Sequence, residues 1–143
     1  PKGYNWKKPE RVLIATNHFE KDPAILDFIF EMAGQYKAGV HTIVFSDEDD
    51  DLPEKMIHYG NQIGTYEKLL KTKYPELSLH TENLFGTEFE ESIEKYASEN
   101  DVDMLVMVTY QRSFWDRIFH PSITRRMSYH THIPLLAIPA DRK

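Results

Sequence analysis

Short apolar runs alternate along the chain with longer segments of helical periodicity, and this alternation limits the fold more than any other feature. Runs this short, bounded by turn residues, are typical of strands buried on both faces of a sheet. Strands that alternate with helices predict an α/β domain of three layers, in which helices cover both faces of a parallel five-stranded sheet. The runs cover residues 11–16, 40–45, 77–82, 104–108 and 133–138.

Recognisable caps mark where the intervening helices begin and end. Asp22 is a good N-cap, and Pro23 suits the first helical position. Thr87 and Glu90 fit a capping box for the third helix, and Gly39 is a natural stop for the first. The other expected starts are Pro53 and Pro121-Ser122, the other expected stops are Tyr74-Pro75 and Asn100, and the second helix carries an apolar stripe of Leu52, Met56, Tyr59, Ile63, Tyr66 and Leu70.

Length, composition and charge exclude several classes of protein. A chain of 143 residues with 41% hydrophobic residues is long enough for one domain with a proper core. The absence of cysteine excludes a disulfide framework and a thiol nucleophile, and it fits a cytoplasmic protein. The net charge of −6 disfavours nucleic acid as a partner. The chain shows no apolar run of membrane-spanning length and no signal-peptide pattern, so no membrane partner is expected.

Spacing alone leaves the order of the strands in the sheet open. Both 2-1-3-4-5 and 3-2-1-4-5 are compatible with right-handed crossovers. The second order places the first strand beside the fourth, so the point where the strand order reverses lies between them. The crevice at that point would then be built from residues 17–22 and 109–122.

The chain resembles the universal stress protein family from about residue 11 to residue 138. The resemblance is carried by VLIATN at the end of the first strand, by Phe85-Gly86 before the third helix, and by DVDMLVMVTYQRS, HPSITRRM and IPLLAIP in the last third. It implies the 3-2-1-4-5 sheet of the adenine nucleotide alpha hydrolase-like fold. It also implies a homodimer or a tandem-domain pair formed through the last strand, from Ile133 to Ile138.

One branch of that family binds ATP with a loop patterned Gly, two residues, Gly, nine residues, Gly, and then Ser or Thr. When the chain is aligned on Ser122, the three glycine positions hold Val108, Gln111 and Pro121. Glycine there lets phosphates approach backbone N–H groups, whereas Val is β-branched and Pro has no N–H to donate. Asn17 replaces the Asp that faces adenine. The resemblance therefore implies the branch that does not bind ATP, with no cofactor.

The alternative is a nucleotide sensor with a degenerate phosphate loop, which would take ATP or AMP. Ser122 after a proline can still cap a helix whose N-terminus attracts anions. The stretch between residues 111 and 130 contains four arginines and only one aspartate. The planar guanidinium of arginine suits phosphate, although the same arginines would also pair with acidic residues on the surface. The residues of this candidate nucleotide crevice are Asn17, Val108, Arg112, Ser113 and Ser122.

Several other conspicuous residues are assigned structural roles. The acidic run of residues 47–51 is expected to be a solvated loop, because adjacent carboxylates repel and stay in water. Three histidines lack a carboxylate or cysteine at ligand spacing, so no metal site is expected. Three aromatic residues are expected to form local core that occludes the crevice, and two aspartates before the fourth strand are expected to be cap and turn residues. The histidines are His120, His130 and His132, the aromatics are Phe114, Trp115 and Phe119, and the aspartates are Asp101 and Asp103.

No catalytic motif is present, so the chain is expected not to be an enzyme. The leading hypothesis is a non-enzymatic stress-response domain in the cytoplasm that acts through dimerisation or partner binding. Residues 1–10 are expected to be a leader or linker, residues 11–139 the domain and residues 140–143 a tail. Because many family members carry two such domains, the chain is expected to be the second domain of a tandem protein. A single domain that lost its Met is the alternative.

Overall fold

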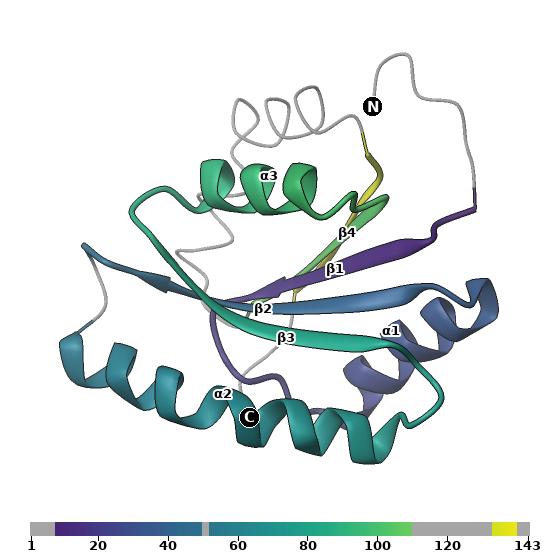
Figure 1. The fold of residues 1–143 in the computed structure, drawn as a ribbon, viewed down its shortest axis with the longest axis horizontal. Coiled ribbons are helices and arrows are strands. Elements are labelled where there is room, and N and C mark those ends of the chain that lie inside the picture. Colours follow the sequence, from purple (N-terminus) through teal and green to yellow (C-terminus); the bar gives the residue numbers. More distant parts are fainter. Residues whose placement is uncertain (1–7, 50–51, 110–132, 140–143) are drawn as a thin grey trace.

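The computed structural model describes residues 8–49, 52–109 and 133–139, which form one parallel sheet flanked by helices (Figure 1). Within these residues the strands are ordered β3-β2-β1-β4-β5, and every pairing is parallel. This confirms the predicted 3-2-1-4-5 sheet and excludes the 2-1-3-4-5 order. The strands are β1 (Arg11–Thr16), β2 (Gly39–Asp47), β3 (Leu79–Gly86), β4 (Met104–Thr109) and β5 (Leu135–Pro139), and the helices are α1 (Pro23–Tyr36), α2 (Pro53–Lys73) and α3 (Phe89–Glu99).

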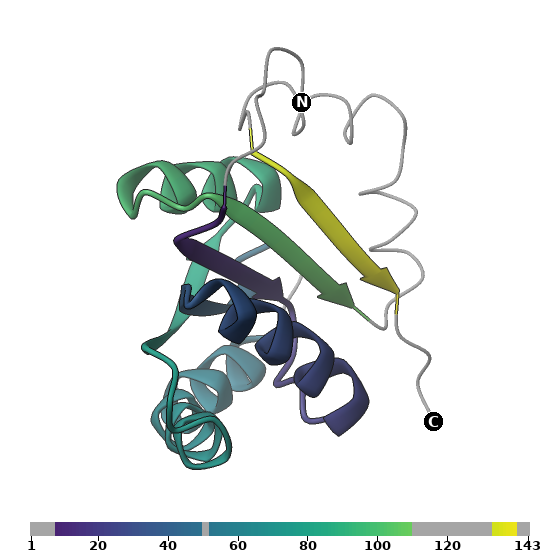
Figure 2. The same ribbon diagram turned by 90° about the vertical axis from the view of Figure 1, so that its right-hand side faces the viewer.

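Helices cover both faces of the sheet: α1 and α2 lie on one face, and α3 lies on the other (Figure 1, Figure 2). Because successive side chains of a strand point to opposite faces, neighbouring residues of β1 enter different cores. Leu13 packs with Ile93 in the core beneath α3, whereas Val12 and Ile14 pack with Ile29 in the core beneath α1 and α2. Burial on both faces explains why β1 reads as an unbroken apolar run.

Of the predictions made for Asp22, Gly39 and Thr87, two differ from the structure. The Asp22 cap is confirmed, because its carboxylate accepts a hydrogen bond from the Ala24 N–H at 2.9 Å. The predicted stop at Gly39 is wrong: α1 is capped by Lys37 in the left-handed conformation, with φ of 56°, and Gly39 begins β2. The predicted capping box is also wrong, because the N-cap of α3 is Glu88 and its side chain makes no capping bond.

The structure confirms the predicted start of α2 at Pro53 and the predicted stops of α2 at Tyr74 and of α3 at Asn100, whereas other boundaries shift by a few residues. β3 begins at Leu79, two residues later than predicted, and continues to Gly86, so that polar Asn83 pairs with β2. Leu52, predicted to lie in the buried stripe of α2, precedes the helix and is 69% exposed. In the acidic run, Asp47 is the last residue of β2. The predicted helix after Pro121 lies outside the described residues.

Asp103, predicted to be a turn residue, ties the start of β4 to the start of β1. One of its carboxylate oxygens accepts hydrogen bonds from the backbone N–H groups of Glu10 at 2.9 Å and Arg11 at 3.0 Å. Its own N–H donates to the carbonyl of Arg11 at 2.9 Å. Hydrogen bonds to a carboxylate are stronger than those between neutral groups. This side chain therefore helps to hold the two central strands in register.

We predict that Asp103→Ala lowers the free energy of unfolding by about 1–2 kcal/mol, because two backbone N–H groups lose a charged acceptor. Urea denaturation followed by circular dichroism would measure the loss. Asp101→Asn is the matched control, since it removes the same charge nearby and Asn tolerates the φ of 52° at that position. Its effect should stay within about 0.5 kcal/mol. Equal losses in the two variants would contradict the role given to Asp103.

Candidate functional site

The reversal of strand order lies between β1 and β4, where ligands bind in open parallel α/β sheets. Thr16 and Val108 are register partners near the carboxyl ends of the two strands, and Asn17 follows directly. The structure therefore brings Asn17 and Val108 to the same end of the sheet. Val108 is 1% exposed and its side chain packs in the core beneath α1 and α2. Its side chain therefore belongs to that core.

A polar network occupies the loop that follows β1. The Nδ1 atom of His18 lies 3.1 Å from the side-chain oxygen of Asn17, and its Nε2 atom lies 3.0 Å from Oε1 of Glu20. The other carboxylate oxygen of Glu20 accepts a hydrogen bond from the N–H of Asp22 at 3.0 Å. Both nitrogens of the imidazole ring thus face oxygen atoms. A protonated ring donates to both of them at once, whereas a neutral ring donates to one.

Helix α2 supports this loop with two tyrosine hydroxyls. Glu20 is 2% exposed, and its backbone carbonyl accepts a hydrogen bond from Tyr66 at 2.8 Å. Tyr59 donates to the carbonyl of Asn17 at 3.1 Å, and the Phe19 ring contacts both tyrosine rings, with centroids 4.8 and 5.1 Å away. Burial raises the pKa of Tyr66, and the neighbouring Glu20 raises it further. The Tyr66 hydroxyl therefore keeps its proton and remains a donor.

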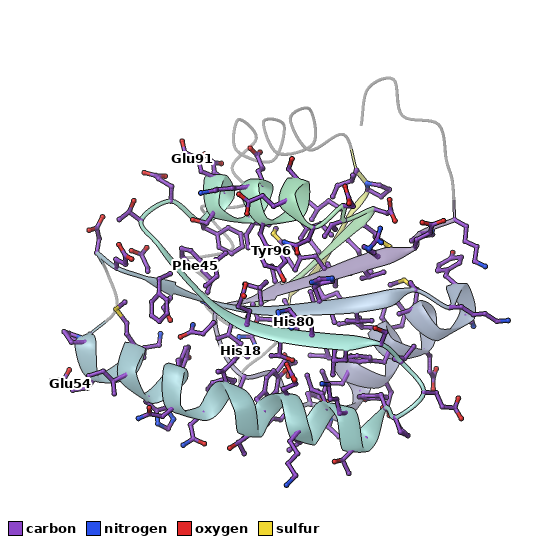
Figure 3. All side chains as sticks on the ribbon, viewed as in Figure 1. His18, Phe45, Glu54, His80, Glu91 and Tyr96 are labelled. Carbon is purple, nitrogen blue, oxygen red and sulfur yellow. The ribbon has the colours of Figure 1, made fainter. Side chains whose placement is uncertain are left out.

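The sequence predicts that residues 17–22 border the crevice, but among them only Asn17 is named as a site residue, so His18 and Glu20 are given no role. Figure 3 shows His18 on the side of the sheet that faces α2. The signal that could have found the pair is a histidine and a glutamate two residues apart, directly after a buried strand. Tyr59 and Tyr66 are predicted as members of an apolar stripe, and their rings do face the core, but their hydroxyls also hold the loop.

Much of the predicted crevice wall falls outside the described residues. Arg112, Ser113 and Ser122 are outside the described residues. The three aromatic residues and three histidines between residues 114 and 132, to which structural roles are assigned from the sequence, are also outside them. In the part of the chain that the structure describes, no group of three or more His, Cys, Asp or Glu side chains is placed to hold a metal ion. No helix in that part combines the length and the apolar character needed to cross a bilayer.

Comparison with known proteins assigns the family. The family model for the universal stress protein family matches residues 9–139, which is most of the chain. The chain belongs to this family. A search of curated proteins finds no match.

Solved structures share the fold of this universal stress protein domain at low sequence identity. UspA from Lactobacillus plantarum is 16% identical, with a TM-score of 0.65 over 94% of this chain and 99% of that chain. The universal stress protein from Archaeoglobus fulgidus in complex with dAMP is 16% identical, with a TM-score of 0.59 over 90% of this chain and 97% of that chain. A universal stress protein in complex with cAMP is 10% identical, with a TM-score of 0.58 over 92% and 98%.

We predict that Tyr66→Phe destabilises this universal stress protein domain by about 1–3 kcal/mol, because the buried carbonyl of Glu20 loses its donor where water does not replace it. Guanidinium denaturation would measure the change. Tyr59→Phe is the matched control, because it removes a hydroxyl from the same helix at a half-buried site. Its cost should be smaller. If the two substitutions cost the same, the loop does not depend on the buried contact between Tyr66 and Glu20.

Proposed function

We propose that the chain is a non-enzymatic universal stress protein domain of the cytoplasm that acts by pairing with a second domain along β5. The partner would be a second copy of the chain or another such domain in a tandem protein. The observation that supports this proposal is the character of β5. Among the described strands it lies at one edge of the sheet, and residues 133–138 are all apolar and only half-buried.

The two edges of the sheet differ in how their backbone groups are used. On β3, the outward N–H of Thr81 donates to a carboxylate oxygen of Glu67 on α2 at 2.7 Å, so a side chain already occupies part of that edge. On β5, the carbonyl of Pro134 accepts from the Leu105 N–H of β4. Alternate residues therefore direct their backbone groups away from β4, and Ala137 is one of them. These outward groups are what an added strand would bind.

We predict that Ala137→Pro weakens self-association, because proline removes an N–H that points away from β4 and leaves the β4 ladder intact. The dissociation constant of the dimer, measured by sedimentation equilibrium, should rise roughly tenfold or more, because each copy in the dimer loses an N–H donor and one hydrogen bond is worth about 1 kcal/mol. Ala137→Ser is the control, because it keeps the N–H. A wild-type chain that stays monomeric at its highest soluble concentration would contradict the homodimer. Equal association of both variants would contradict β5 as the interface.

The polar loop after β1 favours a second candidate function, a nucleotide sensor. Asn17 and His18 follow β1 at the end of the sheet where the strand order reverses, and both carry side-chain groups that can form hydrogen bonds to a ligand. Complexes of related universal stress proteins with dAMP and cAMP support an adenine nucleotide as the ligand class. In this function Asn17 would contact the base, and Arg112, Ser113 and Ser122 would contact the phosphates of ATP or AMP.

Calorimetry with ATP, ADP and AMP separates the two functions. If the chain is a sensor, at least one nucleotide binds, and Asn17→Ala weakens binding by about tenfold, which corresponds to one hydrogen bond. Asn61→Ala, on the exposed side of α2, is the matched control and should not change the affinity. The absence of heat with millimolar nucleotide would end the sensor hypothesis and leave the pairing function.

A further inference from the structure

A second polar cluster lies at the opposite end of the sheet from the crevice, on the face that α3 covers. β2 and β3 place His41 and His80 side by side in register, with ring centroids 5.7 Å apart and the rings edge to face. The hydroxyl of Tyr96 on α3 lies 2.8 Å from Nδ1 of His41. Nε2 of His80 lies 3.8 Å from Oε1 of Glu82. Figure 3 shows Tyr96 between α3 and the sheet, and His80 on β3.

His41 and His80 border a hollow at the amino ends of β1, β2 and β3. Its volume is about 320 Å³, and Arg11, His41 and His80 contribute to its lining. Gly39 lines it as well, and a Cβ atom at that position would find its nearest neighbours, the carbonyl oxygens of Glu10 and Ser78, at 3.9 Å. The lack of a side chain at Gly39 therefore keeps space open beside three donor-bearing side chains. That space suits a small ligand better than a whole nucleotide.

Tyr96 decides which nitrogen of a neutral His41 ring carries the hydrogen. Burial raises the pKa of Tyr96 to about 12, with a further contribution from Glu82, so its hydroxyl keeps its proton. When a neutral His41 ring accepts the hydrogen bond from the Tyr96 hydroxyl at Nδ1, the ring's own hydrogen is on Nε2. The Nε2–H group is then the donor that the neutral ring offers to a ligand. Arg11 adds a planar fork of donors, and its guanidinium forms no ion pair within the described residues.

The surroundings of the His41 ring oppose its protonation. Burial lowers the pKa of His41 most, His80 and Arg11 lower it further, and Glu82 opposes them. The groups that face the ring are thus Arg11 from β1, His80 and Glu82 from β3, and Tyr96 from α3. A bound anion would offset the repulsion that opposes a positive charge on the His41 ring. It would thereby favour protonation of that ring.

We propose that this hollow binds a small oxyanion of the sulfate or phosphate type, held by Arg11, His41 and His80. Two carboxylates oppose such a ligand, since Glu82 pairs with His80 and Glu10 belongs to the lining. Protonation of the histidines offsets these carboxylates, so binding strengthens as the pH falls through the range in which histidine titrates. This site shares no residue with the predicted nucleotide crevice at the other end of β1. The proposal therefore does not depend on dimerisation or on nucleotide binding.

Sulfate is the sharpest probe, because its charge does not change across the range in which histidine titrates. Imidazole resonances would be followed by NMR through a pH titration in sodium sulfate and in sodium chloride of equal ionic strength. We expect sulfate to raise the pKa of His41 relative to chloride, because a nearby opposite charge favours the charged ring, and to move the imidazole resonances of His80. His58, which is exposed on α2, serves as the internal reference and should not shift.

Variants of Arg11 test the site further. Its side chain is exposed, so Arg11→Gln should fold, as circular dichroism would verify, and should abolish the effect of sulfate on both histidines. Arg11→Lys should retain part of it. Lys68→Gln, on the exposed face of α2, removes one charge elsewhere and should leave the effect intact. Equal shifts in sulfate and chloride, equal shifts at His58, or an unchanged response in Arg11→Gln would each overturn the proposal.

Discussion

The burial of β1 between β2 and β4 is the constraint on which the rest of the structure depends. Its backbone is paired on both sides, and its side chains after Arg11 are buried in two separate cores. Each fully buried Val, Leu or Ile of this kind contributes roughly 1.5–3 kcal/mol from removal of apolar surface from water. A strand held so firmly fixes what stands at its two ends. Asn17 and His18 follow it at one end, and Arg11 begins it at the other.

The sequence predicts the elements well because their signals are local. Apolar runs and helical periodicity identify the strands and helices, and the Asp22 cap follows from residues next to one another in the chain. The order of the strands is different, since two orders satisfy the same spacing and the choice came from a family resemblance. Errors arise where local rules compete: Lys37 takes a left-handed conformation that the rules reserve for glycine, and the predicted capping box at Thr87 yields to Glu88.

The candidate sites depend on partners far apart in the chain, and that limits what a sequence can reveal about them. Tyr66 reaches Glu20 across 46 positions, and Tyr96 reaches His41 across 55. Periodicity predicts that Tyr66 faces the core, but it does not say which backbone carbonyl its hydroxyl meets, and it says nothing of the partner of the Tyr96 hydroxyl. Asn17 is predicted to be a residue of the nucleotide crevice because a family pattern marks its position. Nothing comparable marks His18 or the pair of His41 and His80.

The hydrogen bond from Thr81 to Glu67 has a consequence for how far an assembly of such domains can grow. A sheet whose two edges both accept strands can add neighbours without limit, and such growth leads to fibres. Here the outer edge of β3 is partly occupied by a side chain of its own domain, whereas β5 turns backbone groups outward. Pairing through β5 would use up the receptive edge of each partner. The assembly would then close at two domains, with the Glu67 side chain acting as a terminator of the sheet.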